Sequence, residues 1–291
     1  VAYPTANTWY RIHVSSPVGC GSVTDSILVS VVSTDLVGVS ITATDTAFCS
    51  GESSTLTALA ERVQVYDPFE GSLAAMWASV QGGTISGLCG AVSGTALRFD
   101  AAGTRRATTT ALNMSNGANL RFAIRIASGT APCDDAEPGD DVLVEYSLDG
   151  VNWSTIVTLN EAAYPVWTAV TLPIPAAAMT NTTRFRWSQP NNSGVGTENW
   201  AIDRVMITRY DNAGVSFAWS PAAGLSSSTN ATTNATPLTT TDYSVSASTA
   251  NGCAFHSQRH LMVAPAFDLQ VSGGTTICTP GSQVPLLATP L

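Results

Sequence analysis

Alternation of apolar and polar residues with a period of two is the dominant pattern along the chain. It is clearest in Thr8–Val14, Ser26–Val31 and Leu120–Ile126. Such a period places successive side chains on opposite faces of a β-strand. Clusters of Gly, Pro, Asn and Asp separate these runs at intervals of about ten residues, a spacing typical of sandwiches and jelly rolls. The pattern predicts an all-β fold, with only a short helical turn near Pro175–Met179.

Composition narrows the class of protein further. The 291 residues are enough for about two domains. Apolar residues make up 44% and charged residues 11% of the chain, with a net charge of −9 and a pI of about 4.6. An acidic surface disfavours nucleic acid as a partner, because phosphate binding needs cations. The sequence contains no apolar run long enough to span a membrane, so direct membrane insertion is not expected.

The chain also repeats itself. Segments 6–20 and 240–253 each contain a Tyr, an alternating run and a closing Gly-Cys, 233 positions apart. Segments 48–58 and 277–288 share a Cys followed by a Leu-containing strand pattern, 229 positions apart. Two matches at nearly the same offset predict a repeat period near 230 residues, of which the chain covers one period and an overlap.

A first resemblance is carried by motifs on either side of the chain's middle. The motifs are Cys49-Ser50-Gly51, Leu56-Thr57-Ala58, Phe217–Pro221, Gly224–Ser226, Thr236-Pro237, Tyr243–Val245 and Gly252-Cys253. In this order they resemble the bacterial Ig-like (PKD-like) modules of large surface adhesins. Such a module occupies about 100 residues or fewer, yet some 150 residues separate its two parts here. We therefore expect one Ig-like module that is split by an inserted domain.

The intervening segment carries a second resemblance. Its motifs are Phe69-Glu70-Gly71, Trp77, Gly82-Gly83, Cys89-Gly90, Gly94–Phe99, Arg106, Cys133, Val144–Gly150, Trp153, Leu172-Pro173, Arg184–Pro190 and Asn199–Val205. Together they resemble the jelly-roll subrepeat of reelin-type repeats. The EGF-like cysteine cluster that accompanies such repeats is absent from the sequence, so the signalling role of reelin is not carried over.

These resemblances predict Ig-like β-sandwich modules with an inserted jelly-roll β-sandwich. Residues 1–34 are expected to be the C-terminal part of a preceding Ig-like module. Residues 35–62 and 211–265 form the split module, and residues 63–210 form the inserted jelly roll. Residues 266–291 begin a following Ig-like module.

Six cysteines in an acidic β-rich chain favour an oxidising compartment, and none lies in a CxxC pair. The split-module arrangement predicts a disulfide between Cys49 and Cys253. The reelin-type resemblance implies a second disulfide between Cys89 and Cys133. Cys20 and Cys278 are then unpaired within the chain. The alternative is nearest-neighbour pairing, with Cys20 bonded to Cys49 and Cys253 bonded to Cys278.

Catalytic patterns are weak. His256 and His260 are expected on the solvent face of a strand, with no third metal ligand nearby. A G-x-S-x-G nucleophile motif is absent from the sequence. The carboxylates of residues 134–141 follow Cys133 in a Pro- and Gly-containing segment, which is more typical of a solvated loop than of a glycosidase cleft. We expect a non-enzymatic protein.

Calcium is the expected metal, because jelly-roll modules of this kind often hold a structural calcium near the first and last strands. Carried over by position, the resemblance implies Asp67, Glu70, Asp100 and Asp203 as ligands. Carboxylate oxygens are the ligands that calcium prefers. The alternative is that Glu70 and Asp203 form ion pairs with arginines, the candidates being Arg98, Arg106 and Arg204.

Five tryptophans fall in motif positions that either a sugar-binding face or a core would use: Trp77, Trp153, Trp167, Trp187 and Trp200. We expect the core.

The sequence as a whole predicts a structural or adhesive repeat unit of a large extracellular protein on a bacterial cell surface. Its partners would be neighbouring repeats or other copies in a fibre. The alternative is a carbohydrate-binding module of a secreted multidomain protein, with glycans as ligands.

Overall fold

The computed structural model describes residues 8–15, 21–29, 35–264, 269–273, 283 and 286–290. Within these ranges the regular structure is β-strand, apart from two short 3-10 helices at Glu161–Ala163 and Ala176–Ala178. The second of these is the predicted helical turn. The predicted all-β, β-sandwich class is confirmed.

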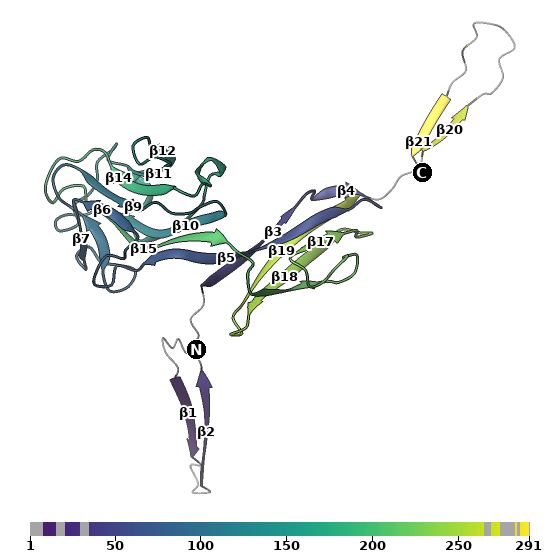
Figure 1. Ribbon diagram of the computed structural model, residues 1–291, viewed down its shortest axis with the longest axis horizontal. Helices are drawn as coiled ribbons and strands as arrows, with labels where there is room; N and C mark the ends of the chain where they lie inside the picture. The colour runs from purple at the N-terminus through teal and green to yellow at the C-terminus, as the bar shows by residue number, and fades with distance from the viewer. Residues whose placement is uncertain are drawn as a thin grey trace. The chain divides into compact units, whose positions relative to one another are not determined.

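The protein folds into two compact units. The first unit is built around residues 61–211, and the second is built from residues 38–60, 212–248 and the described residues from Ala254 onward. Strand β5 (Ser54–Asp67) contributes to both units (Figure 1). Its first residues pair with β17 (Thr232–Ala235), and its last residues pair with β15 (Trp200–Tyr210).

Two sheets form the first unit, and Figure 1 shows them as separate layers. One is a five-stranded sheet in the order β12-β11-β14-β9-β6. Its strands are β12 (Ser154–Leu159), β11 (Val142–Ser147), β14 (Arg184–Gln189), β9 (Arg105–Thr109) and β6 (Trp77–Gln81). The facing sheet contains β13 (Thr168–Pro173), β10 (Gly117–Ile126), β15, β8 (Ala96–Phe99), β7 (Gly83–Ser86) and the end of β5.

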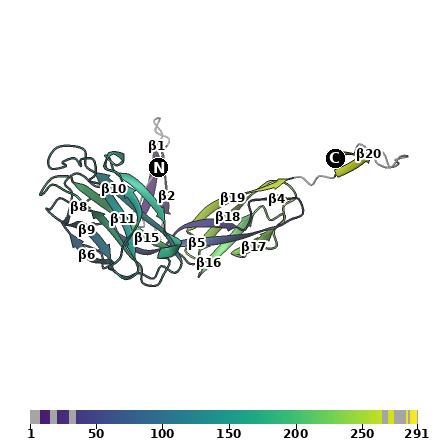
Figure 2. The same cartoon turned by 90° about the horizontal axis from the view of Figure 1, so that it is seen from above.

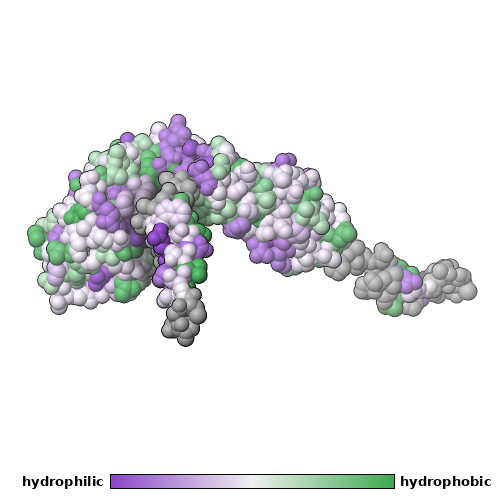
Figure 3. All heavy atoms as spheres, turned by 90° about the horizontal axis from the view of Figure 1, so that it is seen from below, coloured by the Kyte–Doolittle hydropathy of each residue, from purple (hydrophilic) through white to green (hydrophobic). Residues whose placement is uncertain are grey.

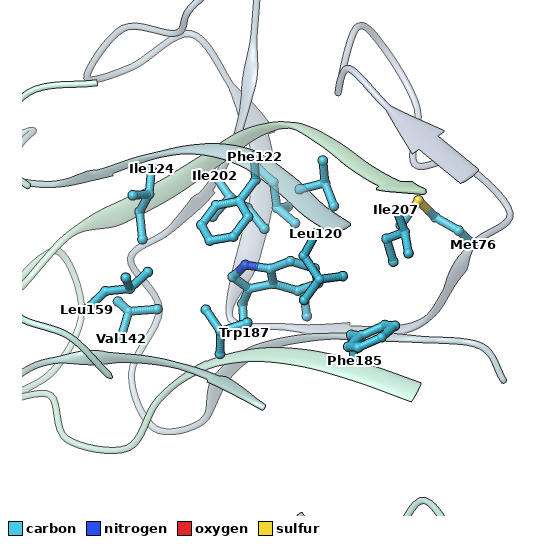
Figure 4. Packing of buried hydrophobic residues seen from close by; sticks show 14 of the residues in the cluster. Met76, Leu120, Phe122, Ile124, Val142, Leu159, Phe185, Trp187, Ile202 and Ile207 are labelled. Carbon is cyan, nitrogen blue, oxygen red and sulfur yellow. The ribbon is translucent and has the colours of Figure 1, made fainter. Parts of the chain in front are cut away.

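A hydrophobic core with aromatic rings at its centre lies between these sheets. Trp187 projects from β14 toward Phe122 and Ile202 of the facing sheet (Figure 4). Its ring meets Phe122 edge-on at 5.4 Å and Trp77 at 5.7 Å between centroids. Because an aromatic side chain buries a large apolar area, this cluster is the main apolar contribution to the stability of the first unit.

The second unit also consists of two sheets. One contains β3 (Leu36–Ala43), the first half of β5, and β17. The other has the order β16-β18-β19-β4, with β16 (Val215–Ser220), β18 (Thr241–Thr249), β19 (Ala254–Ala264) and β4 (Ala47–Cys49); Figure 2 shows β18 and β19 side by side. Buried side chains alternate along β18, where Tyr243, Val245 and Ala247 are inaccessible to solvent. The PKD-like assignment of these strands stays a prediction.

Two further hairpins complete the described structure. Strands β1 (Thr8–Ser15) and β2 (Ser22–Val29) form one two-stranded sheet, and β20 (Leu269–Gly273) and β21 (Leu286–Pro290) form another. The surface drawn in Figure 3 is mostly pale, with scattered strongly hydrophilic residues, as expected for a chain with few charges.

The predicted disulfide between Cys49 and Cys253 is not formed, and both thiols are free. The reason is strand geometry. Cys49 pairs with Ala264 at the end of β19, whereas Cys253 directly precedes the start of the same strand. A strand of 11 residues spans roughly 35 Å, and a disulfide needs Cα atoms within about 7 Å of each other. Cys20 and Cys278, and therefore the alternative pairings, lie outside the described residues.

Candidate functional site

A polar groove crosses the outward face of the five-stranded sheet in the first unit. The strand register places Arg106 of β9 opposite both Gln81 of β6 and Ser188 of β14. Ser188 lies in turn opposite Leu143 of β11. Directly paired residues of antiparallel strands share one face. These four side chains therefore form a row across the sheet, on the face that the core does not use.

A second row runs beside the first and contains an ion pair. Arg186 of β14 lies opposite Glu145 of β11. Arg186 donates to Glu145 through Nε at 2.7 Å and through Nη2 at 2.9 Å, and Ser188 Oγ donates to Glu145 at 2.8 Å. Only 6% of Glu145 is exposed, so its charge depends on these three donors. The result is a fixed, neutralised floor of the groove.

Trp153 lies beside this floor. The guanidinium of Arg186 lies 4.1 Å from the centre of the Trp153 ring, a cation–π contact. Arg186 is thus held between a carboxylate and an aromatic face. One face of the indole ring is covered by this contact.

The hollow above the rows has a volume of about 760 Å³. Asn192 Nδ2 donates to the carbonyl of Gly103 at 2.7 Å, and Asn191 Nδ2 donates to the carbonyl of Gly139 at 3.2 Å. These bonds fix both carboxamides at the rim and leave their oxygens available as acceptors. The lining residues are Gly103, Thr104, Arg105, Arg106, Leu143, Glu145, Arg186, Ser188, Gln189, Pro190, Asn191 and Asn192.

Arg105 forms the buried end of the groove. It is inaccessible to solvent and donates to the carbonyls of Ala101, Glu198 and Gly194. A fourth bond of 3.0 Å joins its Nη1 to Gln189 Oε1. Burial lowers the pKa of Arg105 from its usual value, although the nearby charge of Glu198 opposes this shift. These bonds tie together the loops that border the groove.

Three carboxylates gather next to Arg105. One oxygen from each of Glu137, Asp140 and Glu198 lies within 4.8 Å of the others, a spacing that a cation can bridge. Glu198 is 1% exposed; its Oε2 accepts from Ser193 N at 2.6 Å and Thr197 Oγ1 at 2.7 Å.

The pKa values of two of these carboxyl groups shift in opposite directions. Burial opposes ionisation of Glu198, but the hydrogen bonds from Ser193 and Thr197 outweigh it and lower its pKa. Desolvation and a side-chain hydrogen bond with Glu198 raise the pKa of Glu137. The sequence placed Glu137 and Asp140 in a solvated loop and did not single out Glu198, which is distant in sequence.

The four residues implied as calcium ligands have different surroundings. Asp67 already accepts three hydrogen bonds, from Phe69 N and Ala74 N at 2.8 Å and from Trp77 Nε1 at 2.7 Å. These occupy most of the lone-pair positions of a carboxylate. Asp100 forms an ion pair of 2.6 Å with Arg98. Asp67 and Asp100 are therefore engaged in structural roles.

Glu70 and Asp203 are the two implied ligands that face a shared loop. Asp203 Oδ2 accepts from Val92 N at 2.8 Å, and Glu70 Oε2 accepts from Thr95 N at 3.3 Å. Asp203 is inaccessible to solvent, and its Oδ1 has no hydrogen-bond partner within the described structure. Burial raises the pKa of Asp203 despite hydrogen bonds from the amides of the loop. A Cβ at Gly94 would overlap the carboxylate of Glu70, so the loop fits closely around it.

Ion pairs between these two carboxylates and the candidate arginines are not found among the described residues. Arg98 pairs with Asp100, and Arg106 bonds to Gln81 through Nε at 2.6 Å. The charge of Arg204 favours the ionised form of Asp203 and partly offsets the effect of burial on its pKa, but no ion pair between the two is found among the described residues. The arginine alternative therefore applies to Asp203 only as this weaker interaction.

A disulfide links Cys89 to Cys133, with a Cα–Cα distance of 5.3 Å. It joins the loop that contacts Asp203 to the loop that carries Glu137 and Asp140. Arg98 strengthens the same junction, since its Nη2 donates to Pro132 O at 2.7 Å and to Asn199 Oδ1 at 2.8 Å.

The tryptophans divide between core and surface. Trp187 and Trp200 are buried in the core, and Trp77 packs against it. Trp153 and Trp167 are half-buried and lie outside that core, so the expectation of a core role is wrong for both. Trp153 directly precedes strand β12, at the edge of its sheet, and contacts the guanidinium of Arg186 instead.

The groove residues were not identified from the sequence. The signal was present in Arg184–Gln189, where Phe185 and Trp187 alternate with polar residues. Alternation alone shows that Arg186 and Ser188 face away from the core. It does not show which other strand supplies Glu145 and Arg106.

The remaining expectations concern histidines and the membrane. His256 and His260 are exposed on β19, as predicted, and His260 contacts Asp242 at 2.8 Å. Among the described residues, no helix has the length and apolar character needed to cross a lipid bilayer.

Comparison with known proteins supports part of the predicted resemblance. A sequence model of the family described as Reelin subrepeat B matches residues 82–208, within the range predicted to be a reelin-type jelly roll. Solved structures that match parts of the chain include "Family 16 Carbohydrate Binding Module-2", at 15% identity and a TM-score of 0.30, covering 45% of this chain and 89% of that chain. A second, from work on promiscuous carbohydrate-binding modules of the β-sandwich superfamily, has 13% identity and a TM-score of 0.34, with 69% and 74% coverage. A third, a mannan-recognising carbohydrate-binding module, has 9% identity and a TM-score of 0.28, with 51% and 98% coverage.

Proposed function

We propose that the first unit is a glycan-binding module that uses the groove on its five-stranded sheet. The observation that carries this proposal is the lining of the groove. It presents hydroxyl, carboxamide and guanidinium groups in a hollow of about 760 Å³, within the usual size range of ligand sites. The hydroxyl groups of a saccharide both donate and accept hydrogen bonds. The lining offers acceptors for the first and donors for the second.

Rigidity of the lining supports the same function. Glu145, Arg186 and Ser188 are fixed by mutual hydrogen bonds, and Asn191 and Asn192 are fixed by backbone carbonyls. Polar groups that are already oriented lose little conformational entropy when a ligand binds. A preformed groove of this kind suits recognition without chemistry, in keeping with a non-enzymatic role.

A glycan array with the full chain tests the proposal. Thr104 is exposed at the groove, and Thr104→Trp would fill the hollow without touching the core. Binding to at least one glycan class, lost in Thr104→Trp, is the expected result. Thr229→Trp, at an exposed position of the second unit, is the matched control and should bind normally. Equal binding by both variants would move the site away from the groove.

A second candidate function is that of a structural or adhesive repeat in an extracellular or bacterial cell-surface protein. The exposed hairpin β1–β2 favours it. Trp9 is 66% exposed and Ile12 is 69% exposed, on opposite faces of β1. A two-stranded hairpin with apolar side chains on both faces is marginally stable alone. Neighbouring repeats, or other copies in a fibre, would cover it, in line with the sequence period near 230 residues.

Light scattering on the full chain tests this candidate. Mass that rises with concentration, and that falls to the monomer value in Ile12→Asp, is the expected result. A molecular mass that stays at the monomer value at every concentration would contradict the proposal that other copies of the chain bind this hairpin.

Two further expectations belong to the same proposal. The first unit is interpreted as an insertion into the second, because segments of the second unit lie on both sides of it in sequence.

Calcium is the proposed structural metal, with Glu70 and Asp203 as its carboxylate ligands. The buried, unpartnered Oδ1 of Asp203 supports this assignment, since a cation would stabilise the ionised form.

A further inference from the structure

The charges that line the groove do not cancel. Glu145 is neutralised by Arg186 through two hydrogen bonds, and the buried guanidinium of Arg105 has the carboxylate of Glu198 nearby. Arg106 has no carboxylate within ion-pair distance in the part of the chain that the structure describes. One uncompensated cation therefore remains in the groove, although the chain carries a net charge of −9.

The guanidinium of Arg106 is held in one orientation, but not all of its hydrogen-bond donors are used. Its Nε donates to Gln81 Oε1 at 2.6 Å, which holds the plane of the guanidinium at one edge. Its two terminal nitrogens make no hydrogen bond to another described residue. A guanidinium fork of this kind matches the paired oxygens of a carboxylate or a sulfate better than it matches a hydroxyl group.

The groove also lacks the feature that neutral sugars use most. Among the described residues that line it, none is aromatic, and the apolar side chains are Leu143 and Pro190. Trp153 lies beside the groove, but Arg186 covers one face of its ring. Recognition here depends on hydrogen bonds and charge rather than on stacking of a sugar ring. The acidic group of Glu137, Asp140 and Glu198 is not part of the lining, and the guanidinium of Arg105, which lies near Glu198 and Asp140, offsets part of its charge.

We propose that the groove selects saccharide chains that carry a carboxylate or a sulfate, and that Arg106 is the residue that binds this anionic group. This inference rests on the proposed glycan-binding function of the first unit. Ser188, Asn191 and Asn192 would then contact the hydroxyl groups of neighbouring sugar units. The chain's overall negative charge disfavours non-specific binding of acidic ligands to the rest of the surface, so their binding depends on the local charge of Arg106.

Isothermal titration calorimetry on the full chain tests the inference with three probes of equal length. These are an oligogalacturonate, a sulfated dextran oligomer and an uncharged dextran oligomer. The expected result is binding of at least one acidic probe at least tenfold tighter than the neutral one, weakening as salt is added. Arg106→Gln should weaken acidic binding about ten- to a hundredfold, as expected for the loss of a charge-assisted bidentate contact, and this loss should exceed any loss of binding to the neutral probe.

The matched control is Arg209→Gln, which removes the same charge from β15 outside the groove and should bind as the wild type does. A thermal melt confirms that each variant is folded. Preference for the neutral probe, or acidic binding unaffected by Arg106→Gln, would overturn the anionic selectivity while leaving glycan binding intact. Failure of every probe here and of every glycan on the array would overturn both proposals.

Discussion

The two units of this protein use different means to reach a stable β-sandwich. The first has an extended core in which Trp187 and Phe122 meet, and a disulfide between Cys89 and Cys133. The second contains Cys49, whose thiol is free, and has no disulfide among its described residues.

Two buried aromatic residues of the second unit, Tyr243 and Trp219, are hydrogen-bonded to backbone carbonyls. Tyr243 Oη donates to Ala223 O and Trp219 Nε1 donates to Asn230 O, each at 2.8 Å. Aromatic residues of the first unit contact one another instead.

This difference has a functional meaning. The groove of the first unit is bordered by long loops, which a large core and a covalent link hold in place. The second unit carries polar pairs such as Thr57 with Thr232, and Thr55 with Asn234, between β5 and β17.

The largest expected effect is on the free energy of unfolding, and it tests whether the cores of the two units unfold separately. Trp187→Ala should destabilise the first unit by about 5 kcal/mol, because a fully buried aromatic ring is replaced by a cavity. Trp219→Ala, in the second unit, should lower only the stability of that unit. Differential scanning calorimetry of the full chain should then show separate transitions, each lowered by one variant. One transition that both variants lower equally would contradict the independence of the units.

The disulfide provides the next test. Replacing Cys89 and Cys133 by Ser should destabilise the first unit by about 4 kcal/mol, since the bond closes a loop of 44 residues. Replacing Cys49 and Cys253 by Ser is the matched control and should have little effect. Urea denaturation measures both. An equally large loss in the control would show that these thiols are bonded after all.

Calcium should stabilise the first unit alone. With calcium at a hundredfold excess over its Kd, the free energy of unfolding should rise by about 2.7 kcal/mol, and chelator should abolish the gain. The double variant Glu70→Gln with Asp203→Asn should no longer respond. Glu137→Gln with Asp140→Asn serves as control. If this control loses the response while the first variant keeps it, the acidic group near Arg105 is the calcium site.

The smallest effect concerns pH. Hydrogen bonds from the Val151 amide, the Asn152 side chain and amide, and Ser147 hold the pKa of Asp149 well below its usual 3.8. The unfolded chain takes up this proton at higher pH than the folded one. The stabilisation is therefore complete above about pH 4 and declines as pH falls below that value.

Asp149→Asn should accordingly be less stable than the wild type at pH 7, with a difference that narrows toward pH 3. Urea denaturation across this range measures it. Asp25→Asn is the control, as Asp25 lies in the β1–β2 hairpin outside this turn. A difference that stays constant with pH would exclude the ionised carboxylate as its source.

Much of the architecture could be predicted from the sequence, because burial of one face of a strand requires a local alternation of apolar and polar residues. Phe185 and Trp187 alternate with polar residues, so strand, core face and outward face all follow from the order of residues. The Cys89–Cys133 bond followed from the order of motifs that the chain shares with reelin-type repeats. Residues 82–208 match that family independently.

The prediction of a Cys49–Cys253 disulfide was wrong because the order of motifs along the chain does not give the distance between them in space. The motifs placed the two cysteines at the start and the end of one module. The parallel pairing of β4 with the far end of β19 holds them apart. Strand pairing of this kind is a long-range choice. Nothing local to Cys49 or Cys253 records it.

The sequence by itself determined the β-rich class, the core-facing side of strands such as Arg184–Gln189 and the acidic balance that disfavours nucleic acid. Only the tertiary structure decided which polar residues act together. Arg106, Glu145 and Arg186 lie on three different strands and meet because β11, β14 and β9 are neighbours in one sheet. Hydrophobic periodicity fixes which face a side chain takes, but only strand order fixes its neighbours across the sheet.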